Sequence, residues 1–532
     1  MDFNKQQIEA INCTDRTILC LAGAGAGKTA CLVNRVLRLV NSGVDPRSIL
    51  VLTFTNAAAF EMGERFKMLA PPTKYVPEFR TFHSFAYSLL ARDAEVRTAL
   101  GYSKVPDICD EAEYKQIQTE VKLKLNTKLS IEDLNGKVDP AWTMKQKHEY
   151  ESFRLLLAKT LRSNNLITFD MLNNSLGDLF SKKDAAIVKY HNKYKHILVD
   201  EFQDSDSCEM SFLNSFPSEV NFFFCGDALQ NLYSFRGTSN KFIKMLSADP
   251  NWTHIKLFEN YRSTNQICKF ANKMSHYADP EYRIEMHGQR DGDDVEVIYG
   301  ANANYIEIID NSHMNKLVQM LKTSNEGGAI LCRTNKEVAY VKDRLKQENI
   351  PYVSKLKNND EAINILKAAT DQRFAVNWLA SQLSAGQYAH FVRMTQVKPV
   401  GVKDIIETFS ADSNVVALAT KVLNIHTCLN ADVFPLSSKF GNIVQQLGVY
   451  VPPMSEDITE DNLVEYIQNN IQEQVESQLY VGTIHSSKGL EYDHVYLMGV
   501  DDRSFPIDSE EMKNLYYVGL TRAKNHLTIF RR

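Results

Sequence analysis

The stretch Ile18–Thr29 of this 532-residue chain reads ILCLAGAGAGKT, and it decides the fold. Its apolar first half predicts a buried strand, the alternating glycines and alanines predict a loop, and the apolar-periodic segment that follows predicts a helix. Glycine lets backbone N–H groups approach phosphate oxygens, and the N-terminus of the helix favours the same anion. Lys28 should meet the β- and γ-phosphates, and Thr29 should carry Mg²⁺. We therefore expect an α/β nucleotide-binding domain whose loop consists of Ala22, Gly23, Ala24, Gly25, Ala26, Gly27, Lys28 and Thr29.

A second apolar strand ends in carboxylates. The segment His196–Asp206 reads HILVDEFQDSD, in which a short apolar run precedes Asp200 and Glu201. In P-loop ATPases the first carboxylate of such a pair holds the metal, and the second can orient and deprotonate water. A strand that ends in Asp-Glu is by itself most often a solvated loop, but the upstream glycine loop favours the catalytic interpretation. A third apolar strand, NFFFCG, is followed by Gln230, which could sense the γ-phosphate.

Composition limits the class of protein. A chain of this length predicts two to four domains at roughly 100–200 residues each, and 44% hydrophobic with 23% charged residues is typical of a globular protein. The net charge of −5 neither indicates nor excludes nucleic acid. The nine cysteines form no C-x-x-C pair, which favours buried thiols over a zinc site. No apolar run reaches the ~18–20 residues of a membrane span, and the N-terminus lacks a signal-peptide pattern, so we expect a cytoplasmic protein without a membrane partner.

An ordered set of motifs resembles the UvrD/Rep type of superfamily I DNA helicase. FNKQQIEAI (3–11) is similar to the Q motif of that family and precedes the glycine loop. LTFTNAAAFEM (52–62) and TFHSFA (81–86) resemble two motifs that bind single strands. VDEFQD (199–204) and GDALQNLYSFRG (226–237) resemble the Walker B and coupling motifs. ENYRST (259–264), GTIHSSKGLEYDHVYLMG (482–499) and YYVGLTRAK (516–524) complete the set.

The resemblance implies further nucleotide contacts and the cofactors ATP and Mg²⁺. Gln7 would read the adenine edge, Tyr261 would stack on the base, and Glu491 would accept from the ribose hydroxyl. Arg35 resembles an arginine that lies near the adenine in relatives. Arg262 and Arg522 would reach the γ-phosphate from the second motor domain as arginine fingers, where they would meet charge that develops on the transferred group.

The resemblance also implies contacts to single-stranded DNA. Aromatic stacking grips a strand without regard to sequence, at ~1–3 kcal/mol per base. The candidates for stacking are Phe54, His83, Tyr233 and Phe235, although any one of them could instead be a core residue. Ser486 and Lys488 of the HSSKG loop would contact phosphates.

The spacing of the motifs predicts two RecA-like P-loop NTPase motor domains with two mostly helical insertions. We expect residues 1–88 and 164–258 in the first motor domain and 259–370 and 479–532 in the second. Residues 89–163 and 371–478 would be the insertions. The second insertion is shorter than the accessory domain of the UvrD type, and between Phe440 and Ser487 it contains acidic residues but no lysine or arginine. An acidic face cannot grip phosphates.

We expect an ATP-dependent translocase on single-stranded DNA and on junctions with duplex DNA, with helicase activity in DNA repair, recombination or replication. The forms of the last three motifs imply 3′→5′ polarity. The main alternative is an ATPase subunit that senses nucleotides or DNA ends beside a separate nuclease, as in Gabija-type anti-phage systems. A phage-encoded helicase with a replication or repair partner and an RNA motor are further alternatives.

Overall fold

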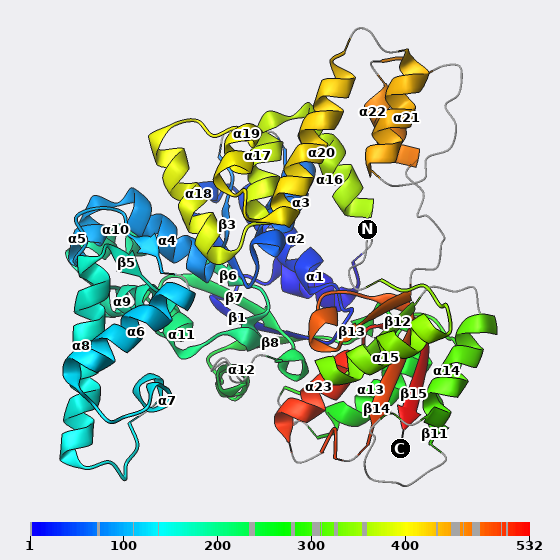
Figure 1. Cartoon of the computed structure of the whole chain (residues 1–532), viewed down its shortest axis with the longest axis horizontal. Helices are drawn as coiled ribbons and strands as arrows, with labels where there is room; N and C mark the ends of the chain where they lie inside the picture. The colour runs from blue at the N-terminus through cyan, green and yellow to red at the C-terminus, as the bar shows by residue number, and fades with distance from the viewer. Residues whose placement is uncertain are drawn as a thin grey trace.

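A computed structural model describes residues 3–71, 75–109, 111–136, 138–232, 240–277, 282–300, 309, 311–323, 328–353, 359–431, 435–447, 458–460, 462–470, 479–501, 503–506 and 509–531. Two parallel sheets with flanking helices lie side by side, and a group of helices from the middle of the chain covers part of the first (Figure 1). Two RecA-like domains with helical insertions are therefore the observed class of fold.

The first sheet has the strand order β3-β2-β6-β7-β1-β8, and all its strand pairs are parallel. The central strands β2, β6, β7 and β1 are apolar and mostly buried, as parallel strands between helices must be, whereas the edge strands β3 and β8 are more polar and only partly buried. They are β1 (Thr17–Ala22), β2 (Ile49–Thr53), β3 (Glu78–Thr81), β6 (His196–Val199), β7 (Asn221–Gly226) and β8 (Thr253–Leu257). Because β1, β6 and β7 are neighbours, the segments that follow them meet at one edge of the sheet.

Helices flank this sheet on both faces and connect its strands. They are α1 (Lys5–Asn12), α2 (Lys28–Asn41), α3 (Asn56–Leu69), α4 (Phe82–Arg92), α9 (Phe169–Ser181), α10 (Ala185–Lys193), α11 (Ser207–Asn214) and α12 (Lys241–Ser247). Two short 3₁₀ segments, η2 (Phe202–Asp204) and η3 (Ala228–Gln230), directly follow β6 and β7. They bring the polar residues of those segments to the edge where β1 also ends.

The second sheet has the order β11-β15-β14-β12-β13 and is also parallel. Its strands are β11 (Glu296–Tyr299), β12 (Gly328–Cys332), β13 (Leu479–Thr483), β14 (Tyr492–Val500) and β15 (Ala523–Arg531). Its helices are α13 (Asn265–Ser275), α14 (Asn311–Thr323), α15 (Asn335–Gln347) and α23 (Glu510–Leu520). A small pair, β9 (Glu259–Asn260) with β10 (His287–Gly288), lies at the junction of the two motor domains.

The first insertion is helical and has a core of its own. It contains α5 (Ala94–Ala99), α6 (Glu111–Leu125), α7 (Ile131–Asn135) and α8 (Met144–Ser163), and the pair β4 (Asp107–Ile108) with β5 (Leu166–Ile167) closes it. Val121, Phe153 and Leu161 are fully buried at the centre of this core. The lysine-rich helices of the insertion therefore form a separate packed unit beside the first sheet.

The second insertion packs on the first motor domain. It contains α16 (Asn359–Thr370), α17 (Gln372–Ser381), α18 (Ala385–Val397), α19 (Val402–Thr408), α20 (Ser413–Leu429), α21 (Leu436–Leu447) and α22 (Leu463–Asn470). The rings of Phe60 and Phe374 meet edge to face at 5.5 Å and join α3 to α17, and Arg393 pairs with Asp107 of the first insertion. Figure 1 shows α16 to α20 grouped around α3. Because α16 packs against α17 and α20, we propose that this insertion starts at Asn359 rather than at residue 371.

One hydrophobic core joins these parts. It contains Leu19 and Leu21 of the first sheet, Leu497 of the second and Trp378 of the second insertion, all nearly or fully buried. Within the described residues, no helix has the length and apolar character needed to cross a membrane. Most of the acidic stretch predicted in the second insertion lies outside the described residues, and within them Glu460 pairs with the buried Lys439.

Candidate functional site

The glycine loop after β1 has the conformation that its sequence predicts. Gly25 and Gly27 have φ values of 69° and 78°, in the left-handed region that favours glycine. A Cβ atom on Gly25 would lie 2.7 Å from the Cβ of Arg262, so the loop also touches the second motor domain too closely for a side chain. Helix α2 starts at Lys28, and its first backbone N–H groups are oriented as an anion site requires.

Three carboxylates surround the ammonium group of Lys28. Burial acts to lower the pKa of Lys28, but Glu201, Asp227 and Asp200 outweigh burial and raise it. Burial and the adjacent Glu201 raise the pKa of Asp200 to about 7. For Glu201, burial opposes ionisation, but Lys28 and Lys488 lower its pKa below the ordinary value. Glu201 therefore remains a charged base beside the lysine, with its backbone in the left-handed region at φ 53°.

Gln203 links the segments after β6 and β7 and was not singled out from the sequence. Its Nε2 donates to Glu201 Oε2, and its Oε1 accepts from the backbone N–H of Asp227 at 2.9 Å. Asp227 in turn accepts from Gln230 Nε2 at 2.7 Å. Gln203 is the glutamine of the motif VDEFQD, so the motif itself could have indicated a functional role for this residue. Through these bonds Gln203 fixes the position of Glu201 relative to Gln230, whose side chain is buried and bound to Asp227.

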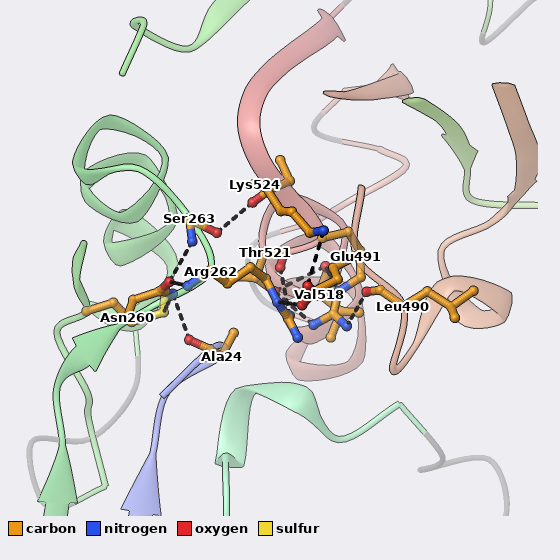
Figure 2. Close-up of polar contacts among 12 residues, drawn as sticks. Ala24, Asn260, Arg262, Ser263, Leu490, Glu491, Val518, Thr521 and Lys524 are labelled. Carbon is orange, nitrogen blue, oxygen red and sulfur yellow. Dashed lines mark hydrogen bonds and ion pairs between the residues drawn. The ribbon is translucent and has the colours of Figure 1, made fainter. Parts of the chain in front are cut away.

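The second motor domain contributes a cluster of charged side chains (Figure 2). Arg262 donates from Nε to Glu491 at 2.7 Å and from Nη1 to the carbonyl of Thr521 at 3.1 Å. Lys524 also pairs with Glu491, at 3.3 Å. Arg522 is 1% exposed and donates to backbone carbonyls at the end of α23 and before Glu491. Burial and the neighbouring Arg262 lower the pKa of Arg522 to about 9.

The predicted adenine contacts hold the start of the chain to the loop. Gln7 Nε2 donates to the carbonyl of Ala26 at 3.0 Å, and its Oε1 accepts from the backbone of Asn4. Asn4 Nδ2 donates to the hydroxyl of Tyr261 at 2.8 Å. Arg35 is buried against Phe223 and donates to the carbonyl of Ala10, so it joins α2 to α1. Tyr261 is 44% exposed and is therefore the residue of this group best placed to meet a base.

Comparison with known proteins identifies this arrangement. The UvrD/REP helicase N-terminal domain matches residues 3–251. The UvrD-like helicase C-terminal domain matches residues 255–359 and 441–531. The chain belongs to the UvrD/Rep helicase family. Residues 360–440 lie between the two matched segments of the C-terminal domain, where the second insertion was expected to depart from its relatives.

This UvrD-like helicase is similar to several proteins named ATP-dependent DNA helicase PcrA. That of Leuconostoc citreum is 26% identical over 99% of this chain and 81% of its own length. Those of Staphylococcus aureus (strain NCTC 8325 / PS 47) and Staphylococcus epidermidis are each 25% identical over 99% of this chain and 83% of their own length. The similarity therefore extends over both motor domains and the insertions.

Helicases of this family use ATP with Mg²⁺, and two side chains at the glycine loop suit the ion. Thr29 Oγ1 lies 3.3 Å from Asp200 Oδ2. Asp200 is 6% exposed, and its Oδ1 has no hydrogen-bond partner among the described residues. A partly buried hydroxyl and a carboxylate with one oxygen left without a hydrogen bond suit Mg²⁺, which takes few protein ligands beside water and phosphate. Thr29 and Asp200 would hold the ion, which would neutralise charge on the phosphates.

The residues predicted to contact DNA differ in their accessibility. His83 of this UvrD-like helicase is partly buried edge to face against Phe169 at 4.8 Å, and burial lowers its pKa. Phe54 is partly buried after β2. Ser486 bonds to Thr483 and Tyr480 of the preceding strand β13. Lys488 lies in an ion pair between the motor domains. Tyr233 and Phe235 lie outside the described residues.

Proposed function

We propose that this UvrD-like helicase hydrolyses ATP with Mg²⁺ to move 3′→5′ along single-stranded DNA and to unwind the duplex ahead of it. One observation carries the proposal. Lys28 and Glu201 belong to the first motor domain, and Arg262 and Arg522 belong to the second. The charges of Lys28 and Arg522 both act on Glu201, and the Cβ of Arg262 lies against Gly25 of the glycine loop, so the four come together where the two domains meet.

Contacts between the two motor domains support a motor in which hydrolysis needs both of them. The backbone N–H of Tyr261 donates to the carbonyl of Gly25 at 3.0 Å, and the charge of Arg522 is close enough to Glu201 to lower its pKa. In the proposed cycle, Lys28 and the two arginines meet the γ-phosphate, and Glu201 takes a proton from the attacking water. Because the arginines come from the far side, turnover is tied to closure of the cleft.

The nucleic-acid part of the proposal rests on the relatives and on the motifs. The similar proteins are named ATP-dependent DNA helicases, and the last three motifs of this chain resemble the 3′→5′ branch of the family. Single-stranded DNA would cross the loop after β2, which contains Phe54, the start of α4, which contains His83, and the HSSKG loop of the second domain. A role in cytoplasmic DNA repair, recombination or replication follows from that activity.

The test is steady-state ATP hydrolysis with and without single-stranded DNA, together with strand displacement on duplexes that have a 3′ or a 5′ tail. We expect strong stimulation by DNA and displacement on the 3′-tailed duplex alone. The variant Lys28→Ala controls for a contaminating helicase. Displacement on the 5′-tailed duplex alone would refute the polarity, and hydrolysis that ignores DNA would refute the motor.

A second candidate is an ATPase subunit that senses DNA ends and works beside a separate nuclease. Two observations favour it. The alignment with the Leuconostoc citreum protein spans 614 positions against 532 residues in this chain, so the relative has segments that this chain lacks. The second insertion packs on the first motor domain through Phe374 and on the first insertion through Arg393. DNA-stimulated hydrolysis without displacement on either tail would favour this candidate.

A further inference from the structure

Lys488 connects the two motor domains through a buried ion pair. Its Nζ lies 2.6 Å from Asp204 Oδ2 and donates to the carbonyl of Gln230 at 3.1 Å. The side chains of Lys488 and Asp204 are 13% and 2% exposed. Lys488 follows η5 (His485–Ser487) in the second domain, whereas η2 and η3 of the first domain contain Asp204 and Gln230. A lysine expected to contact phosphate is therefore directed into the protein.

Both partners of Lys488 belong to segments that contain residues of the proposed hydrolysis. Asp204 is three residues after Glu201 in the same segment, and Gln203 between them bonds to Glu201 and to Asp227. Gln230 follows Asp227 and bonds to it. The ammonium group thus holds the ends of both segments at once. A shift of the HSSKG loop would move both segments, and with them Glu201 and Gln230.

The pair cannot separate without leaving a buried charge. Asp204 Oδ1 has no hydrogen-bond partner among the described residues, and Lys488 is the cation in direct contact with this carboxylate. Breaking a buried ion pair by removing one partner is strongly unfavourable, whereas removing both is much less so. The loop and the two segments should consequently move as one body when the cleft opens or closes.

We propose that Lys488 is a positioning residue for ATP hydrolysis: it ties the HSSKG loop to the segments of Glu201 and Gln230 through Asp204, and DNA stimulates hydrolysis through this tie. The inference rests on the proposed function, because it needs a DNA-stimulated ATPase. It replaces the phosphate contact that the sequence predicts for Lys488. A positioning role for Lys488 leaves the affinity for DNA unchanged, whereas a phosphate contact contributes to that affinity.

The test compares Lys488→Met with wild type in ATP hydrolysis and in binding of a fluorescent single-stranded oligonucleotide across a salt series. We expect the DNA-stimulated kcat to fall at least tenfold, while KM for ATP, Kd for DNA and the slope of log Kd against log salt stay within error of wild type. A phosphate contact would instead weaken binding and reduce the slope by about one. That result, with kcat unchanged, would overturn the inference.

Further variants separate positioning from a loss of folding. Asp204→Asn should lower kcat as Lys488→Met does, and the double variant should lose no more than either single variant; full additivity of the losses would overturn the inference. Lys488→Arg keeps the charge and should retain part of the stimulation. Lys322→Met is the matched control, because Lys322 forms a surface pair with Glu348 at 2.8 Å in the same domain. If Lys488→Met fails to fold, the DNA-stimulated kcat of Asp204→Asn and of the double variant tests the inference instead. A wild-type protein without DNA stimulation would instead refute the proposed function.

Discussion

Arg262 Nε lies 2.7 Å from Glu491 Oε2, so two side chains assigned to opposite ends of ATP are bound to each other. Arg262 is expected at the γ-phosphate and Glu491 at the ribose. Lys524 also pairs with Glu491, at 3.3 Å. With these two assignments, bound ATP would draw Arg262 away from the carboxylate, and Lys524 would then compensate the charge of Glu491.

This relationship predicts different kinetic effects for the two residues. Arg262→Ala should lower the DNA-stimulated kcat by ~10³-fold or more, as the loss of an arginine finger does, with a small change in KM. Glu491→Ala should mainly raise KM for ATP, since a ribose contact acts equally in the ground and transition states. Steady-state kinetics over a range of ATP concentrations separates the two effects. A raised KM in Arg262→Ala together with a lowered kcat in Glu491→Ala would contradict both assignments.

Lys28→Ala should reduce ATP hydrolysis by ~10²-fold or more, because one preorganised charge at a developing anion contributes about that factor. The variant should also bind ATP more weakly, because it lacks the ammonium group that Lys28 places at the start of α2. Hydrolysis and binding of a fluorescent ATP analogue measure the two effects. Lys403→Ala, an exposed lysine of α19, serves as the control. Turnover within a few-fold of wild type would disprove the assignment of Lys28.

Glu201→Gln should slow hydrolysis by ~10²–10⁴-fold while ATP still binds, because the amide cannot accept the proton of water. The variant should then accumulate on single-stranded DNA in the ATP-bound state, which filter retention with labelled ATP would detect. Glu219→Gln changes an exposed acid of the same domain and should behave as wild type. Normal turnover of Glu201→Gln would exclude Glu201 as the base.

His494 should make the stability of the second motor domain depend on pH. Burial and the neighbouring His526 lower the pKa of His494 to about 4, and its Nε2 lies 2.9 Å from Thr528 Oγ1. The unfolded chain binds the proton more tightly, so this contribution is present above pH 6.5 and is lost as pH falls towards 4. The loss is on the order of 1–3 kcal/mol.

Thermal unfolding between pH 7.5 and 4.5 measures this effect. The Tm of His494→Gln should fall less steeply with acid than that of wild type, because glutamine can keep the hydrogen bond but does not titrate. Parallel curves for the two proteins would show that another group governs the acid response.

The sequence predicts the parts of the site that lie in continuous segments. The loop from Ala22 to Thr29, the carboxylates after β6 and the parallel sheets follow from local pattern, because strand, turn and helix signals lie within a few residues of one another. The class of fold is confirmed, and so is the family. The roles of the individual site residues remain proposals.

Pairings between distant segments could not be predicted from the sequence. Lys488 is 284 residues from Asp204 in the sequence, and nothing near either residue indicates that they meet. Gln7 is also engaged at both ends of its amide, by Asn4 and by Ala26, although its motif indicates only a base contact. A motif indicates what kind of group a residue can bind, whereas the residue that it contacts in the fold depends on how the two motor domains pack.

The core shared by Leu21, Leu497 and Trp378 has a consequence for calorimetry. Apolar surface buried between domains makes their unfolding cooperative, since neither can melt without exposing the other's half of the contact. The described parts should consequently absorb heat in one main transition rather than in one for each sheet. The same contact limits the stroke of the motor, because sliding of packed surfaces preserves burial and wide separation does not. Each ATP would then drive a small shear between the two sheets.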